Sequence, residues 1–70
     1  MVMSVYKVIE LVGTSGDSWE DAASSAISLA RKSLRDMRVA EVVEQDIDLS
    51  DDSVTYRTKL RVSFKYEGGE

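Results

Sequence analysis

The segment at residues 54–66 alternates strictly between two kinds of side chain over thirteen positions. Because successive side chains of a β-strand point to opposite faces of a sheet, this period of two predicts a long strand. One face is apolar or aromatic apart from one threonine, and the other is polar and basic. The first face carries Val54, Tyr56, Thr58, Leu60, Val62, Phe64 and Tyr66, and the second carries Thr55, Arg57, Lys59, Arg61, Ser63 and Lys65.

Two further segments predict strands. Residues 5–12 are rich in β-branched and apolar side chains and end at Gly13. Their apolar residues fall on both faces, so this strand needs cover on both sides. Residues 38–49 form the other predicted strand, in which the alternation fails around Val42 and Val43 and allows a β-bulge.

A helix is predicted from Trp19 to about Arg35, because apolar residues recur there at spacings of three and four. Residues 13–17 are rich in Gly, Ser and Thr and predict a turn before it. Ser18 is the expected N-cap, and two acids follow in the first turn, where the helix dipole favours them. Cations in the predicted last turns suit the opposite end of the dipole, and they are Arg31, Lys32 and Arg35.

The order of these elements predicts an α+β fold of the type β-α-β-β. The last two strands are joined by a short polar turn at residues 50–53 and should form an antiparallel hairpin. The helix should make a right-handed crossover from the first strand to the second and cover one sheet face. We expect a single domain over residues 1–70, with an ordered core at 4–66 and a flexible tail at 67–70.

Composition excludes several chemistries. The chain of 70 residues contains no Cys, His or Pro and carries a net charge of -4. A disulfide, a thiol nucleophile, a Cys/His zinc site and an imidazole base are therefore absent, and the acidic balance argues against nucleic acid. Apolar stretches are too short for a membrane span, and no secretory signal is seen, so a cytoplasmic location is expected. No catalytic constellation stands out, and we do not expect an enzyme.

The small size of the chain favours self-association. A domain of about 60 residues buries only about 60% of the surface that its unfolded chain exposes, and small scaffolds without disulfides or metals are often stabilised by oligomerisation. The sheet face without the helix presents a basic strand beside an acidic one, which predicts cross-strand ion pairs. That face is either solvated or lines a symmetric assembly or a ligand groove. Its acids are Glu41, Glu44, Asp46 and Asp48.

Three local motifs favour structural interpretations. The Gly-rich loop at residues 13–18 lacks the Lys of a Walker A loop and the third Gly of a dinucleotide fingerprint. The acidic run at residues 46–52 is not an EF-hand, because Asp51 replaces the central Gly and Arg57 the final Glu. A weaker ion site with oxygen ligands, shared between subunits, stays open. Aromatic residues are interpreted as packing anchors, and they are Trp19, Tyr6, Tyr56 and Tyr66.

Four sequence blocks in this order resemble the dodecin family. They are VYKVIELVGTS at residues 5–15, SWEDAA at 18–23, RVAEVVEQ at 38–45 and YRTKLRVSF at 56–64, and the resemblance covers about residues 4–66. It implies a β-α-β-β subunit whose three-stranded antiparallel sheet wraps around one helix. It also implies a hollow homododecamer built from trimers.

The resemblance has two implications for ligands. Many dodecins bind riboflavin or FMN, with a stacking Trp, a hydrogen-bonding Gln and acids at the ribityl chain. The Trp position is Val39 here and the Gln position is Arg57, so a flavin-type pocket is degenerate in this chain. Val39 and Arg57 beside Glu44-Gln45-Asp46 are similar to a dodecin branch that lacks the flavin site and binds calcium. The flavin-pocket positions are Val39, Glu44, Gln45, Asp48 and Arg57, and oxygen chemistry suggests Glu44, Asp46 and Asp48 as Ca²⁺ ligands.

These features leave two functions open. The first is a small-ligand binding or storage shell with a degenerate flavin pocket. The alternative is a calcium-binding or purely structural dodecin that binds no flavin.

Overall fold

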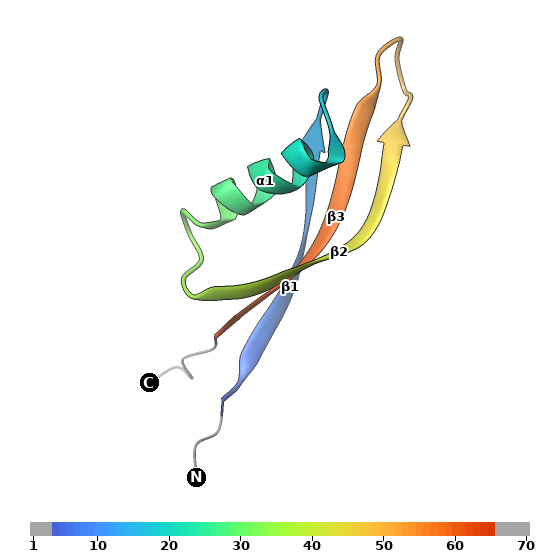
Figure 1. Cartoon of the computed structure of the whole chain (residues 1–70). Helices are drawn as coiled ribbons and strands as arrows, with labels where there is room; N and C mark the ends of the chain where they lie inside the picture. Colours follow the sequence, from blue (N-terminus) through green and yellow to red (C-terminus); the bar gives the residue numbers. More distant parts are fainter. Residues whose placement is uncertain (1–3, 66–70) are drawn as a thin grey trace.

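The computed structural model describes residues 4–65 of the chain, and these residues form four elements. They are β1 (Tyr6–Ser15), α1 (Trp19–Ala30), β2 (Met37–Asp48) and β3 (Thr55–Lys65). The strands form one antiparallel sheet in the order β1-β3-β2, and α1 lies on one of its faces (Figure 1). The predicted α+β fold and β-α-β-β order are confirmed. The expected tail at residues 67–70, and residue 66 of the expected core, lie outside the described residues.

The central strand is the segment with strict alternation. Thr58, Leu60 and Val62 of β3 are the largest fully buried side chains, because β1 and β2 flank them and α1 lies over β1 and β3. Ala22 and Ala30 supply the helix side of this contact and are buried. Their small side chains let the helix approach the sheet closely. The face that carries Thr58 and Leu60 is called the inner face below, and the opposite face is called the outer face.

β1 is longer than the sequence predicts. It continues through Gly13 to Ser15, which pairs with Tyr56 of β3, so the turn predicted for residues 13–17 is wrong in its first half. Position 13 is a glycine because α1 passes close to the strand there. A Cβ added to Gly13 would lie 2.0 Å from the carbonyl oxygen of Ala22. Glycine is required here by the close approach of α1 within a strand, and its presence does not mark a turn.

α1 begins as predicted and ends earlier. The Ser18 hydroxyl accepts a hydrogen bond from the Asp21 backbone N–H at 3.0 Å, which confirms the N-cap. The helix ends at Ala30, so the prediction that Arg31, Lys32 and Arg35 lie in its last turns is wrong. A turn with hydrogen bonds that span three residues follows, in which Lys32 N–H donates to the Leu29 carbonyl at 3.1 Å. The chain then reverses at Asp36, which has a φ of 58° and whose carbonyl accepts from Lys65 N–H.

β2 carries two irregularities. The pairing with β3 shifts between Val42 and Glu44, which confirms the bulge predicted at residues 42–43. A second shift, between Met37 and Val39, leaves Arg38 outside the regular ladder. Bulges bend a strand and increase its twist, and β2 curves along its length in Figure 1. The predicted hairpin between β2 and β3 is confirmed by their antiparallel pairing.

Candidate functional site

The outer face of the sheet carries a network of opposite charges. Basic side chains of β3 lie between acidic side chains of β1 and β2, since β3 is the central strand. The predicted cross-strand ion pairs are therefore confirmed, although one of the acids, Glu10, lies on β1 and was missed. Its register partner is Arg61, and the available signal was that Glu10 is the single acid of β1. The paired residues are Glu10, Glu41, Asp46, Arg57, Lys59 and Arg61.

The strongest contact of this network joins Arg57 to Asp46. The guanidinium donates from Nε to Oδ1 at 2.6 Å and from Nη2 to Oδ2 at 2.7 Å, the two-bond geometry that fits a carboxylate. The hydrogen bond from Arg57 holds the pKa of the Asp46 carboxyl below its usual range, and the same bond raises the pKa of Arg57. Both groups stay charged at neutral pH.

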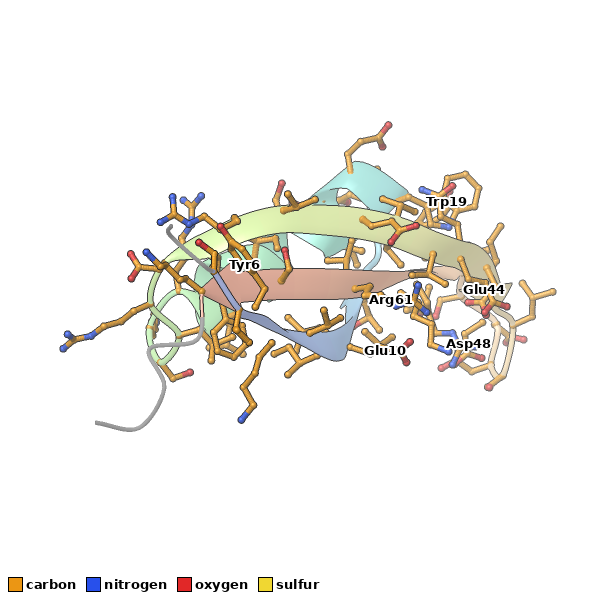
Figure 2. All side chains as sticks on the ribbon, turned by 90° about the horizontal axis from the view of Figure 1, so that it is seen from below. Tyr6, Glu10, Trp19, Glu44, Asp48 and Arg61 are labelled. Atoms are coloured by element: carbon orange, nitrogen blue, oxygen red, sulfur yellow. The ribbon has the colours of Figure 1, made fainter. Side chains whose placement is uncertain are left out.

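A second group of charges is centred on Glu10. Its carboxylate accepts a hydrogen bond from Arg61 Nη2 at 3.2 Å and lies 3.9 Å from Lys59 Nζ. The Arg61 guanidinium also reaches Glu41 Oε1 at 3.7 Å, so it links β1 to β2 across β3. Figure 2 shows the side chains of Glu10 and Arg61 next to each other. These pairs are solvent-exposed, and such pairs add little stability individually.

The structure brings together only part of the expected flavin pocket. Glu44 and Asp46 line an outer-face hollow of about 240 Å³ with Arg57, Lys59 and Val12. Val39 is 61% exposed and pairs with Ser63, which is six residues from Arg57 along β3. At about 3.4 Å per residue the two positions are about 20 Å apart. Within one chain they cannot contact the same small ligand.

Gln45 lies on the other side of the sheet from its neighbours. It pairs with Thr58, whose hydroxyl is buried and donates to the Trp19 carbonyl at 3.0 Å. Glu44 and Asp46 are directed to the outer face, because the strand alternates. Gln45 is therefore separated from the acids that the sequence analysis grouped with it.

The three expected calcium ligands do not fit one ion within a single chain. Both Asp46 oxygens are taken by Arg57. Asp48 Oδ1 accepts from the backbone N–H and the hydroxyl of Ser50, and these bonds lower the pKa of Asp48. Glu44 has no hydrogen bond or ion pair with residues 4–65. Over the same residues, no group of three acidic, His or Cys side chains is placed to hold a metal.

Trp19 is a packing anchor, as predicted. Its indole N–H donates to the Asp46 carbonyl at 3.0 Å, and its ring meets the Tyr56 ring edge-on at 5.2 Å between centroids. These contacts fasten the start of α1 to β2 and β3. Tyr6 differs, because it is 47% exposed in the single chain and lies toward the other end of the sheet from Glu44 and Asp48 (Figure 2). Tyr66 lies outside the described residues.

These observations define a small α+β protein with a charge-paired outer sheet face and a helix on the inner face. α1 has 12 residues, and the described part of the chain contains no helix that could span a membrane. The family model "Dodecin" matches residues 5–67. The chain therefore belongs to the dodecin family.

Two curated relatives and two solved structures illustrate the similarity. The chain is 58% identical to the calcium dodecin of Mycobacterium tuberculosis over 64 residues, 90% of each protein. It is 41% identical to the dodecin of Thermus thermophilus, over 90% of this chain and 93% of the relative. The crystal structure of the calcium-chelating M. tuberculosis protein, with a novel calcium-binding site, matches with a TM-score of 0.84 at 53% identity, over 96% and 97% of the chains. Streptomyces coelicolor dodecin matches with a TM-score of 0.89 at 30% identity, over 99% and 100%.

Proposed function

We propose that the protein is a homododecameric shell, built from trimers, that binds Ca²⁺ and does not bind flavin. Its role is binding or storage, without catalysis. The observation that carries this proposal is the identity of 58% to the calcium dodecin of M. tuberculosis. The ion pair between Arg57 and Asp46 argues against flavin, because it occupies the position where the flavin-binding family members have a Gln.

Self-association is supported by how little apolar surface one chain buries. Among the described residues the buried hydrophobic side chains are Ala22, Ala30, Leu60 and Val62, whereas Val8, Val12, Leu29 and Val39 are more than half exposed. The radius of gyration is 14.6 Å, and a compact domain of this length has about 11 Å. Copies that shelter these side chains from water gain the burial that the single chain lacks.

Flavin binding is disfavoured at both family positions. Val39 offers no ring on which an isoalloxazine could stack. Arg57 presents donors without an acceptor, so it cannot reproduce the paired donor and acceptor of an amide. Its fork is also already engaged by Asp46.

Calcium binding is supported by the identity of 58% to the calcium dodecin of M. tuberculosis. Ca²⁺ takes six to eight oxygen ligands, which one chain does not provide at Glu44, Asp46 and Asp48. We therefore assign the ligands to more than one copy, with Glu44 as the contributor whose carboxylate is not engaged in residues 4–65. A symmetry axis beside Glu44 would bring several copies of that carboxylate together.

The proposal is tested on one purified sample. Light scattering should give the mass of twelve chains, and the visible spectrum should show no flavin absorbance. The melting temperature should rise with Ca²⁺ and fall with chelator, because a ligand that binds only the folded form stabilises it. Glu44→Gln should abolish the calcium shift, whereas the exposed loop variant Asp52→Asn should keep it. A monomeric mass, a yellow protein, or an unchanged melting temperature with Ca²⁺ would each contradict the proposal.

A further inference from the structure

The two ends of β2 carry opposite charges. Residues 31–38, at its start, contain four cations and one acid, and residues 48–53, at its end, contain three acids and no cation. We call residues 31–38 the basic turn and residues 48–53 the acidic tip, since the first links α1 to β2 and the second is the tip of the β2–β3 hairpin. Their formal charges are +3 and −3. The cations are Arg31, Lys32, Arg35 and Arg38, and the acids of the tip are Asp48, Asp51 and Asp52.

The charges of both segments lack partners in their own chain. None of the four cations of the basic turn makes a side-chain hydrogen bond or ion pair within residues 4–65. Within the same residues the acids of the tip form no ion pair, and the hydrogen bonds to Asp48 and Asp51 come from serines of the tip. The chain therefore carries a positive and a negative segment that it does not neutralise itself.

One chain cannot bring the two segments together. They lie at the two ends of the twelve-residue strand β2, and a strand of that length spans roughly 35–40 Å. Figure 1 shows the link from α1 to β2 and the β2–β3 hairpin at opposite ends of the fold. Charges separated by more than about 10 Å are largely screened in salt solution. Neutralisation therefore needs a second molecule, and another copy of this chain offers both charges.

Apolar side chains accompany the charges on both segments. Leu49 of the acidic tip is 71% exposed. Leu34 of the basic turn lines a hollow of about 330 Å³ between α1 and β1, together with Ile9 and Leu29, and Leu29 is 68% exposed. An apolar centre with a polar rim is the usual composition of a specific protein interface. The tip and the hollow thus complement each other in charge and offer apolar surface to each other.

We propose that the acidic tip of one copy packs on the basic turn of the next copy, with Leu49 in the hollow between α1 and β1. The contact joins two different surfaces, so it is head-to-tail, and contacts of this kind generate rings where the rotation closes. A ring of three copies is the trimer of the proposed assembly. The inference rests on the proposed function, because it needs self-association, and it adds which segments meet.

The two parts of this contact have different roles. Burial of Leu49 and Leu29 supplies the apolar part of the stabilisation. Exposed ion pairs are weak individually, but complementary charges fix the orientation of the copies, because the arrangements in which like charges meet are disfavoured. The contact therefore depends on the signs of the charges, which substitutions can exchange.

Exchange of these charges tests the contact in the full-length protein. Lys32→Glu/Arg35→Glu makes the basic turn acidic, and Asp51→Lys/Asp52→Lys makes the acidic tip basic. Each double variant should raise the concentration at which half of the assembly has dissociated by about tenfold or more, because like charges then meet. The variant with all four substitutions pairs opposite charges again and should return to within about threefold of the parent. Sedimentation velocity over a dilution series measures this concentration.

Two further variants serve as controls. Lys32→Glu/Arg35→Glu combined with Asp17→Lys/Glu20→Lys has the same net charge as the fourfold exchange but leaves the tip acidic, so it should not restore assembly. Where a tip variant does not fold by circular dichroism, Leu49→Ser tests the same contact, because a side chain that is 71% exposed in one chain contributes little to its fold. It should raise the half-dissociation concentration by about threefold or more, since apolar burial is lost.

Three results would overturn this inference alone. The first is parental stability of the assembly in both double variants, and the second is a fourfold exchange that folds but stays dissociated. The third is equal restoration by the net-charge control, which means general repulsion between charged chains. Asp52→Asn leaves two acids at the tip, so it should weaken assembly less than the double tip variant. A parent with the mass of one chain would contradict the proposed function together with this inference.

Discussion

Arg57 and Asp46 are register partners on β3 and β2, and they are joined by two hydrogen bonds of 2.6 and 2.7 Å. This pair neutralises an acid that would otherwise be a candidate ion ligand. It also fixes a guanidinium at the position where the resemblance to flavin-binding dodecins implies an amide. Within a single chain, the same contact therefore argues against flavin binding and against Asp46 as a ligand of Ca²⁺.

The pH dependence of this pair can be measured directly. Arg57 lowers the pKa of Asp46, so the pair contributes stability above the pKa of the unfolded carboxyl, and this contribution is lost as the pH falls through the lower folded pKa. In Arg57→Gln the pKa of Asp46 should rise toward its usual range, as followed by NMR of the carboxyl carbon. Asp51 is the internal control, because its pKa is lowered by Ser53 and should not move. An unchanged Asp46 titration in the variant would show that the pair does not form in solution.

Gly13 should be among the positions least tolerant of substitution. In Gly13→Ala the new Cβ would lie 2.0 Å from the Ala22 carbonyl oxygen, so the helix or strand must shift. We expect a loss of about 1–3 kcal/mol in the free energy of unfolding, the usual cost of overpacking. Gly16→Ala is the matched control, because nothing lies within 4 Å of its added Cβ, and it should stay within about 0.5 kcal/mol. Chemical denaturation at fixed protein concentration measures both, and equal effects would contradict the assigned contact.

The same glycine explains where sequence reasoning succeeded and failed on the fold. The alternation at residues 54–66 and the bulge at Val42 depend on local pattern, and both were predictable. Gly13 was assigned to a turn because glycine is common in turns, but the reason for it is a helix carbonyl distant in sequence. The chain reversal at Asp36 and its bond to Lys65, a residue distant in sequence, were likewise not predicted. Tertiary contacts of this kind leave no periodic signal.

The residue types of the candidate site were predictable from the sequence, but the ion pairs that they form were not. The sequence gathered basic residues on one face of β3 and acids on β2, and cross-strand pairs followed. It could not choose among partners, so the bond from Arg57 to Asp46 and the involvement of Glu10 emerged only with the register. The separation of Val39 from Arg57 also depends on register, because residues distant in sequence approach only through pairing with β3.

The N-cap of α1 allows a prediction about the free energy of unfolding. The Ser18 hydroxyl satisfies the Asp21 N–H, one of the donors that a helix leaves free at its N-terminus. Ser18→Ala should therefore lower the free energy of unfolding by about 1 kcal/mol. Ser25→Ala is the control, because Ser25 is exposed within the helix and alanine has the higher helix propensity. The control should be neutral or slightly stabilising, and a similar loss in both variants would argue against capping.

The flavin positions can be restored by substitution. Val39→Trp should add roughly 0.5–1.5 kcal/mol of ring stacking per contact, and Arg57→Gln returns an amide and releases Asp46. Because the two positions lie about 20 Å apart in one chain, a pocket can form only between copies. We expect the double variant to quench flavin fluorescence when assembled and Val39→Trp alone to bind more weakly. If the assembled double variant binds no flavin, positions 39 and 57 do not form a pocket at a subunit contact. The backbone around them then differs from that of a flavin-binding dodecin, in addition to the two side chains.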